Sequence, residues 1–405
     1  MQNKNMTLPK EQGPTRYEVA IQRAPEQLLD QLSHDERITD LLQDIEEARV
    51  DAGQIKPSDR DYVPGDTLGM QRAMSNVFSF RKQGGERNEY EEMPQVELFR
   101  GRIEALAHEY GFTNDTVPEN PNATAGVVLG GRATGSYDRT RYTKELIDNG
   151  YLDTDTIVLL GSTRPADSID RKAGEIFDDA VDEYDIMKIA AKDVFGVEFD
   201  DTEDLQGFDG SVATGFEQGW RIAHAKTTDG KDVFVLSAPQ LTDNFHHNNR
   251  RRDRANTGDT LNMFAKVARY EQGSHAVVIT NAHFKPFQGA EAVGNLDRYG
   301  VTAETVGFEP EHFDRPSKAP EELMEEMFTA VNSSVRAEKG AHDHVKKSLA
   351  REVANKNNYK DSIELGELTD DPDIAIDEYN LEIYEHNKRI QALESRLAKI
   401  ALLNK

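Results

Sequence analysis

The chain of 405 residues contains no cysteine and no long apolar run. The absence of cysteine excludes structural disulfides and thiolate chemistry. Every apolar stretch, such as Val277-Val278-Ile279, is broken well before the ~18 consecutive apolar residues that a membrane-spanning helix needs. Residues 1–16 are polar and lack the apolar segment of a signal peptide. We therefore expect a cytoplasmic protein without a membrane span.

Basic residues are scarce relative to acidic ones. The chain has 48 Lys and Arg against 74 Asp and Glu, a formal net charge of −26. A field of that sign repels nucleic acid and anionic membranes, so neither is expected as a partner. An anionic small molecule must therefore meet a local basic site.

Residues 1–120 have the pattern of a helical region. Ser33 and Glu36 form a capping-box sequence, which predicts a helix beginning there. A second helix is expected near residues 96–110, closed by Gly111. The first helix has apolar residues at the spacing that places them on one face, namely Ile38, Leu41, Leu42 and Ile45.

Residues 121–315 have the pattern of an α/β domain. Amphipathic helical segments lie between most of five short apolar runs, which predicts parallel strands joined by right-handed crossovers. We expect a Rossmann-like, doubly wound, mostly parallel five-stranded sheet with helical N- and C-terminal extensions. The runs are rich in β-branched residues, typical of strands buried on both faces, and cover 126–129, 156–160, 233–236, 276–280 and 301–306.

Two segments depart from this alternation. Residues 166–231 are too long for a simple crossover and are expected to hold an acidic, helical insertion. A solvated acidic face is favoured there over a metal site, because no calcium-binding loop occurs. Residues 316–405 are expected to be helical, and the segment after Asp377 carries about three heptads. That last helix either builds a homo-oligomer or docks on its own chain.

The candidate ligand-binding residues follow the strands, because doubly wound sheets bind ligands at the carboxyl ends of their strands. A glycine-rich turn after the first strand leads into a helix whose free amides suit a phosphate or carboxylate. Tight packing of helix on strand is the other explanation for these glycines, and the turn lacks both Walker and dinucleotide spacing. The candidates in the first two loops are Gly130, Gly131, Arg132, Ser136, Ser162 and Arg164.

Four arginines occupy the five positions 250–254, after the third strand. Arginine forks suit phosphates and carboxylates, so an anion is the expected ligand, with Arg254 among its contacts. Ion pairing with the acidic insertion is the alternative. Asn256, Thr257 and Asp259 follow and are expected to contact or orient the ligand, and Asp259 is also a candidate catalytic residue.

Polar residues also follow the fourth strand. His283 is the candidate general acid or base, because an unperturbed imidazole titrates near neutrality. A structural, hydrogen-bonding role is the alternative for this histidine. Asn281 and Lys285 are further candidate ligand contacts.

The order of these loops resembles the YdcF/SanA/ElyC family, a bacterial group of domains of unknown function. The resemblance covers about residues 123–308 and implies a Rossmann-like sheet with a crevice that could take S-adenosylmethionine. It adds Arg139 and Arg141 as ligand contacts. The motifs that carry it are Val128-Leu129-Gly130-Gly131, Arg139 and Arg141 with Leu146 and Gly150, Leu160-Gly161-Ser162, Asn256-Thr257-Gly258-Asp259, and Thr280-Asn281-Ala282-His283.

Two functional hypotheses result. In the first, the chain binds a phosphorylated, nucleotide-like or S-adenosylmethionine-type small molecule at the carboxyl ends of its strands, as a hydrolase, a transferase or a binding protein. In the second, the helical flanks build a non-catalytic oligomeric scaffold and the sheet is only structural.

Overall fold

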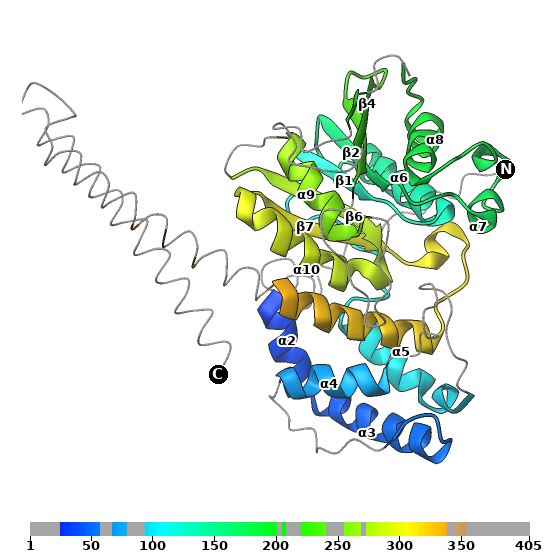
Figure 1. Cartoon of the computed structure of the whole chain (residues 1–405), viewed down its shortest axis with the longest axis vertical. Coiled ribbons are helices and arrows are strands. Elements are labelled where there is room, and N and C mark those ends of the chain that lie inside the picture. The colour runs from blue at the N-terminus through cyan, green and yellow to red at the C-terminus, as the bar shows by residue number, and fades with distance from the viewer. Residues whose placement is uncertain are drawn as a thin grey trace, which may run out of the picture. The chain divides into compact units, whose positions relative to one another are not determined.

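The computed structural model describes residues 25–56, 67–78, 94–200, 205–207, 220–239, 255–268 and 273–337, with single residues at 346, 350 and 353 (Figure 1). The chain divides into two compact units, Met1–Val335 and Arg336–Lys405. The predicted heptads after Asp377 and the arginines at 250–254 lie outside the described residues. The boundaries predicted near residues 120 and 315 stay predictions.

The N-terminal region is helical, with α2 (Pro25–His34), α3 (Glu36–Asp51), α4 (Thr67–Val77), η1 (Pro94–Phe99) and α5 (Arg100–Glu109). The apolar face expected on α3 is buried. The expected capping box is wrong, because the N-cap of α3 is Asp35, whose side chain accepts from Arg37 N, while Ser33 Oγ donates to Asp30 O. These helices share a core with Phe287 and with a helix at residues 320–337 (Figure 1).

The central element is a sheet of seven strands within the described ranges. Its order is β3-β4-β5-β2-β1-β6-β7, in which β5, β2, β1, β6 and β7 are parallel. All five predicted strands occur in this parallel part. The strands are β1 (Ala125–Leu129), β2 (Thr156–Ser162), β3 (Leu205–Gly207), β4 (Trp220–Lys226), β5 (Asp232–Ala238), β6 (His275–Asn281) and β7 (Thr302–Phe308).

The expectation of five strands is corrected by an antiparallel pair at one edge. β3 pairs with β4, and β4 pairs antiparallel with β5. Both strands lie in or near the segment predicted as a helical insertion, so that segment is only partly helical. Besides α7 (Ser168–Arg171) and η2 (Glu175–Phe177), it contains α8 (Glu183–Phe195), which packs on β2 and β5 and forms part of the connection between them.

Helices cover both faces of the sheet. α6 (Ala133–Asp148) and α8 pack on one face, with Tyr142 and Met187 in its two apolar clusters. α9 (Thr257–Ala268) and α10 (Lys285–Leu296) pack on the other, with Phe264 and Leu296. The strand order reverses between β1 and β6, and the crevice outside the carboxyl ends at such a point is where open α/β sheets bind ligands.

Three short 3-10 helices complete this part of the chain: η3 (Ala282–Phe284) and η4 (Asp297–Tyr299) flank α10, and η5 (Pro310–Phe313) follows β7. Within the described ranges, no helix combines the length and apolar character that a membrane span needs.

Candidate functional site

The close approach of the loops after β1 and β2 depends on Gly130. A β-carbon at this position would overlap Leu160 O and would lie 2.7 Å from Glu183 Oε1. The missing side chain therefore allows the end of β1 to lie against β2 and the first turn of α8. Ser162, at the end of β2, is held in the same place, since its Oγ donates to Glu183 and accepts from Arg164 N at 3.2 Å.

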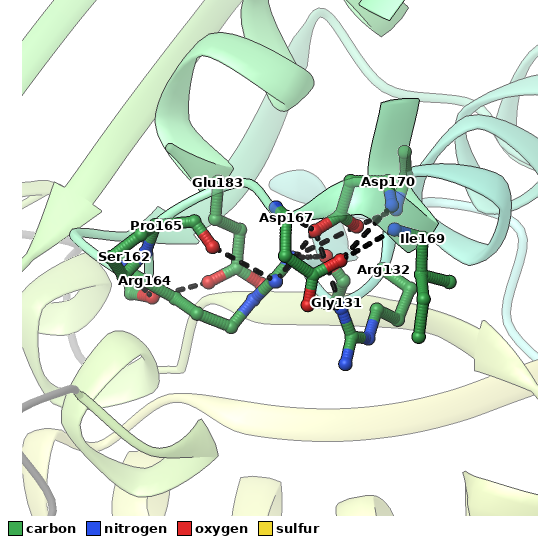
Figure 2. A network of polar contacts seen from close by, with 10 residues as sticks. Gly131, Arg132, Ser162, Arg164, Pro165, Asp167, Ile169, Asp170 and Glu183 are labelled. Atoms are coloured by element: carbon green, nitrogen blue, oxygen red, sulfur yellow. Dashed lines mark hydrogen bonds and ion pairs between the residues drawn. The ribbon is translucent and has the colours of Figure 1, made fainter. Parts of the chain in front are cut away.

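A buried guanidinium, that of Arg164, joins the first two loops (Figure 2). Its Nη1 donates to Asp170 Oδ2 at 2.8 Å, and its Nη2 donates to Gly131 O at 2.9 Å and to Asp170 Oδ1 at 3.3 Å. Burial alone would lower the pKa of Arg164, but the hydrogen bond to Asp170 and nearby carboxylates raise it. Arg164 is therefore a fixed cation.

The carboxylate of Asp170 lies at the N-terminus of α6, where the sequence predicts a bound phosphate or carboxylate. Asp170 is 1% exposed, and its Oδ1 accepts from Ala133 N at 2.9 Å while its Oδ2 accepts from Asp167 N at 3.1 Å. Burial would raise the pKa of Asp170, but Arg164 and the two backbone N–H groups lower it. The helix terminus and Arg164 thus hold an anion that belongs to the chain itself.

Arg132 is the cation of this network that reaches solvent, with its side chain 32% exposed. Its Nη1 donates to Asp167 Oδ2 and lies 3.4 Å from Asp170 Oδ2. The hydrogen bond from Arg132 is the largest influence on Asp167, whose pKa falls to about 2. Figure 2 shows Arg132, Arg164, Asp167 and Asp170 grouped around Gly131.

Arg139 joins the ends of β1 and β6 where the strand order reverses. Its Nη1 donates to Leu129 O at 2.8 Å and to Gly130 O at 2.5 Å, and its Nε donates to Asn281 Oδ1 at 2.8 Å. Arg139 is only 3% exposed. The structure therefore brings together Arg139 and Asn281, which are both candidate ligand contacts, and the Arg139 guanidinium also donates to backbone carbonyls.

Arg141 contacts a different set of residues. It is on α6 about 12 Å along the helix axis from Ala133, at 1.5 Å per residue. Its Nη1 lies 3.8 Å from Asp138 Oδ1, and its guanidinium stacks 4.2 Å from the ring centroid of Phe313. None of these contacts is shared with Arg132 or Arg164. Arg254 lies outside the described residues.

Asn256 and Asp259 form a reciprocal cap at the start of α9. Asp259 Oδ2 accepts from Asn256 N at 3.0 Å, and Asn256 Oδ1 accepts from Asp259 N at 2.8 Å. This arrangement satisfies two backbone donors of the helix and explains the residue types locally. Thr257 is the first residue of α9, and its carbonyl accepts from Thr260 Oγ1 at 2.9 Å.

Three of the candidate site residues, His283, Lys285 and Ser136, are buried near the starts of helices. His283 is 5% exposed, with its ring 4.0 Å from that of Phe284, and Lys285 is 1% exposed. Ser136 is fully buried in α6, and its Oγ has no hydrogen-bond partner within the described part of the chain. These positions do not open onto solvent in the way that Arg132 does.

Sequence reasoning missed the acidic members of the site, Asp167, Asp170 and Glu183. A signal was present, because Asp167-Ser168-Ile169-Asp170 has the spacing of a capping box, and the structure contains that box. It also missed the loop after β7, where His312 lies between Asp115 and Glu145 at 2.7 and 2.8 Å. Across the described ranges, no group of three or more acidic or histidine side chains is arranged to hold a metal ion.

No protein-family model matches the chain, and no solved structure matches it. The chain is similar to uncharacterized proteins of Mycobacterium bovis and Mycobacterium tuberculosis, with 25% identity over 247 residues. The match covers 59% of this chain and 64% of each relative, so it spans less than two thirds of the relatives' length. The names of these relatives state no activity, so the similarity does not indicate what the site does.

Proposed function

We propose that the chain binds an anionic small molecule at the carboxyl ends of β1 and β2, in a Rossmann-like fold. The observation that carries the proposal is the convergence of Arg132, Arg164 and the Ala133 amide on one carboxylate. A helix N-terminus with arginine forks is an arrangement that suits phosphate and carboxylate groups. These donors already bind one carboxylate, that of Asp170, which supports an anionic group as the ligand's contact here.

The charge of the molecule favours a confined site of this kind. With a net charge of −26, most of the surface repels an anion, whereas Arg132 offers a partly exposed cation beside the fixed cation of Arg164. Gly130 lets the loops after β1 and β2 approach each other closely, which brings these cations to one place. The ligand classes that fit are phosphorylated, nucleotide-like and S-adenosylmethionine-type molecules, the last one with its carboxylate at the arginines.

The proposal concerns binding. His283 and Asp259, the two candidate catalytic residues, are 5% and 1% exposed. Hydrolase or transferase activity therefore stays a sequence-based expectation, as does the resemblance to the YdcF/SanA/ElyC family. A homo-oligomer built by the last helix also stays a prediction, because that helix lies outside the described residues.

Calorimetric titration with AMP, glucose 6-phosphate and S-adenosylmethionine tests the proposal. A charge-assisted hydrogen bond contributes about 1.5–3 kcal/mol, so Arg132→Ala should weaken binding of the preferred ligand by about 10- to 100-fold. Arg141→Ala is the matched control, since it removes an arginine on α6 that pairs with Asp138 instead. Absence of binding for all three ligands, or equal losses in both variants, would contradict the proposal.

A further inference from the structure

We propose that residues 167–174, here called the α7 strap, form a built-in competitor whose Asp170 carboxylate occupies the place of the ligand's anionic group. This inference rests on the proposed function and adds a regulatory contact to it. The strap contains α7 and lies between the end of β2 and η2. Its effect is to hold the site closed until an external anion replaces Asp170.

The contacts of Asp170 are those of a bound anion. Its two oxygens accept from both terminal nitrogens of Arg164, from the Ala133 and Asp167 amides, and from Arg132. Four of these five donors belong to residues outside the strap, and Asp167 N alone belongs to it. A phosphate group, with three acceptor oxygens, can satisfy the same outside donors.

Asp170 is the buried attachment of the strap, which is also held by the exposed Asp167 on Arg132 and by the partly buried Ala173. Among residues 167–176, Asp170 is the only buried residue, while Ile169 and Ile176 are each 48% exposed. Movement of the strap away from the site would therefore expose little additional apolar surface to water. Replacement of Asp170 by a ligand that also binds Arg132 would remove the strap's buried attachment and compete with its exposed one.

The chain on both sides of the strap is held by contacts of its own. Ala166 N donates to Val181 O at 2.9 Å, and Glu183 N donates to Arg164 O at 2.9 Å, so the two ends are paired. Phe177 is 2% exposed and packs edge-on against Tyr137, at 6.0 Å between ring centroids. The structure thus anchors both sides of the strap independently of Asp170.

An attached competitor lowers the apparent affinity for a free one, because its effective concentration is in the millimolar range or above. Removing its charge should therefore strengthen ligand binding. Asp170→Asn is the suitable variant, since it keeps the size of the side chain and its amide oxygen still accepts from Ala133 N, while the charge and the second acceptor oxygen are removed. Asp178→Asn is the matched control, because it removes the same charge from an exposed residue just beyond the strap.

The test is calorimetric titration of AMP into the wild type and both variants. We expect Asp170→Asn to bind AMP at least tenfold more tightly than the wild type, and Asp178→Asn to stay within twofold of it. Equal affinities of wild type and Asp170→Asn would overturn the inference and leave the proposed function standing. No AMP, glucose 6-phosphate or S-adenosylmethionine binding by any of the three proteins would refute the proposed function itself.

Hydrogen–deuterium exchange of the wild type gives a second readout, which decides the matter if Asp170→Asn fails to fold. Saturating AMP should accelerate exchange of the backbone amides of residues 167–174 and leave those of residues 177–183 unchanged. Unchanged or slower exchange across the strap, with AMP bound, would overturn the inference.

Discussion

Asp170 Oδ2 accepts a hydrogen bond from Arg164 Nη1 at 2.8 Å, and both side chains are buried at the carboxyl end of β2. The pair connects the segment after β2 with the N-terminus of α6, because Asp170 also accepts from Ala133 N. The stability of the fold and the proposed binding site therefore depend on the same two residues.

Removing the cation of this pair should destabilise the fold. Arg164→Met leaves Asp170 buried without its main partner, and breaking a buried pair in this way costs about 3–5 kcal/mol. Lys144→Met is the control, since Lys144 and Asp148 form an exposed pair on α6 that contributes about 0.5 kcal/mol or less. Urea unfolding followed by circular dichroism measures both, and equal stabilities of the two variants would show that the buried pair is dispensable.

Gly130→Ala should destabilise the protein by about 1–3 kcal/mol, because the added carbon overlaps Leu160 O and crowds Glu183. Gly101→Ala is the matched control. Gly101 is an exposed residue of α5 with no atom within 4 Å of the added carbon, so its substitution should stabilise by up to about 1 kcal/mol. Thermal unfolding of the two variants should show changes in stability of opposite sign. An unchanged stability of Gly130→Ala would mean that β1 and β2 can move apart at no cost.

His312 should make the protein less stable in alkaline solution. Burial lowers the pKa of His312, but hydrogen bonds with Asp115 and Glu145 raise it to about 9. Because the folded pKa lies above the unfolded value of 6.5, this contribution is complete below pH 6.5 and is lost as pH rises through 9. After allowance for solvent screening, it amounts to about 1–2 kcal/mol.

The measurement for His312 is the free energy of unfolding of wild type and His312→Gln between pH 6 and about pH 10. The difference between them should shrink as pH rises. A difference that is constant over this range would show that the imidazolium charge contributes nothing, and that only the shape of the ring matters.

Glu309 should oppose folding above neutral pH. Burial, followed by the charges of Asp115 and Glu311, raises its pKa to about 7. The folded state therefore favours the protonated carboxyl, and its stability falls as pH rises from 4.5 through 7. Glu309→Gln should thus be more stable than wild type at pH 8 by about 1 kcal/mol, whereas the exposed Glu311→Gln should show a smaller gain. A less stable Glu309→Gln at pH 8 would contradict this assignment.

The parallel part of the sheet was predictable from the sequence because β1, β2, β5 and β6 each contain a continuous apolar run. Strands buried on both faces need no alternation of polar residues, and the turns around them were marked by glycines such as Gly150. β3 and β4 escaped prediction because neither is an apolar run. β4 reads Trp-Arg-Ile-Ala-His-Ala-Lys, with exposed His224 and Lys226 alternating with buried alanines, and β3 is only Leu-Gln-Gly.

The candidate site was predictable in its location and only partly in its contacts. The sequence placed Arg132 and Arg164 in loops that do meet. It could not show that Asp170 would meet them, since that contact depends on how the segment after β2 folds back onto α6. Asn256 and Asp259 illustrate the same limit, because a helix cap and a ligand contact require the same residue types.

Binding of an anion at the N-terminus of α6 is tested most directly by the NMR resonance of the Ala133 backbone amide, followed during titration with AMP. This amide now donates to Asp170 at the place proposed for the ligand. We expect AMP to shift the Ala133 resonance in the wild type, and we expect Arg132→Ala largely to abolish the shift at the same AMP concentration. AMP that binds while the Ala133 resonance stays unchanged would contradict this expectation.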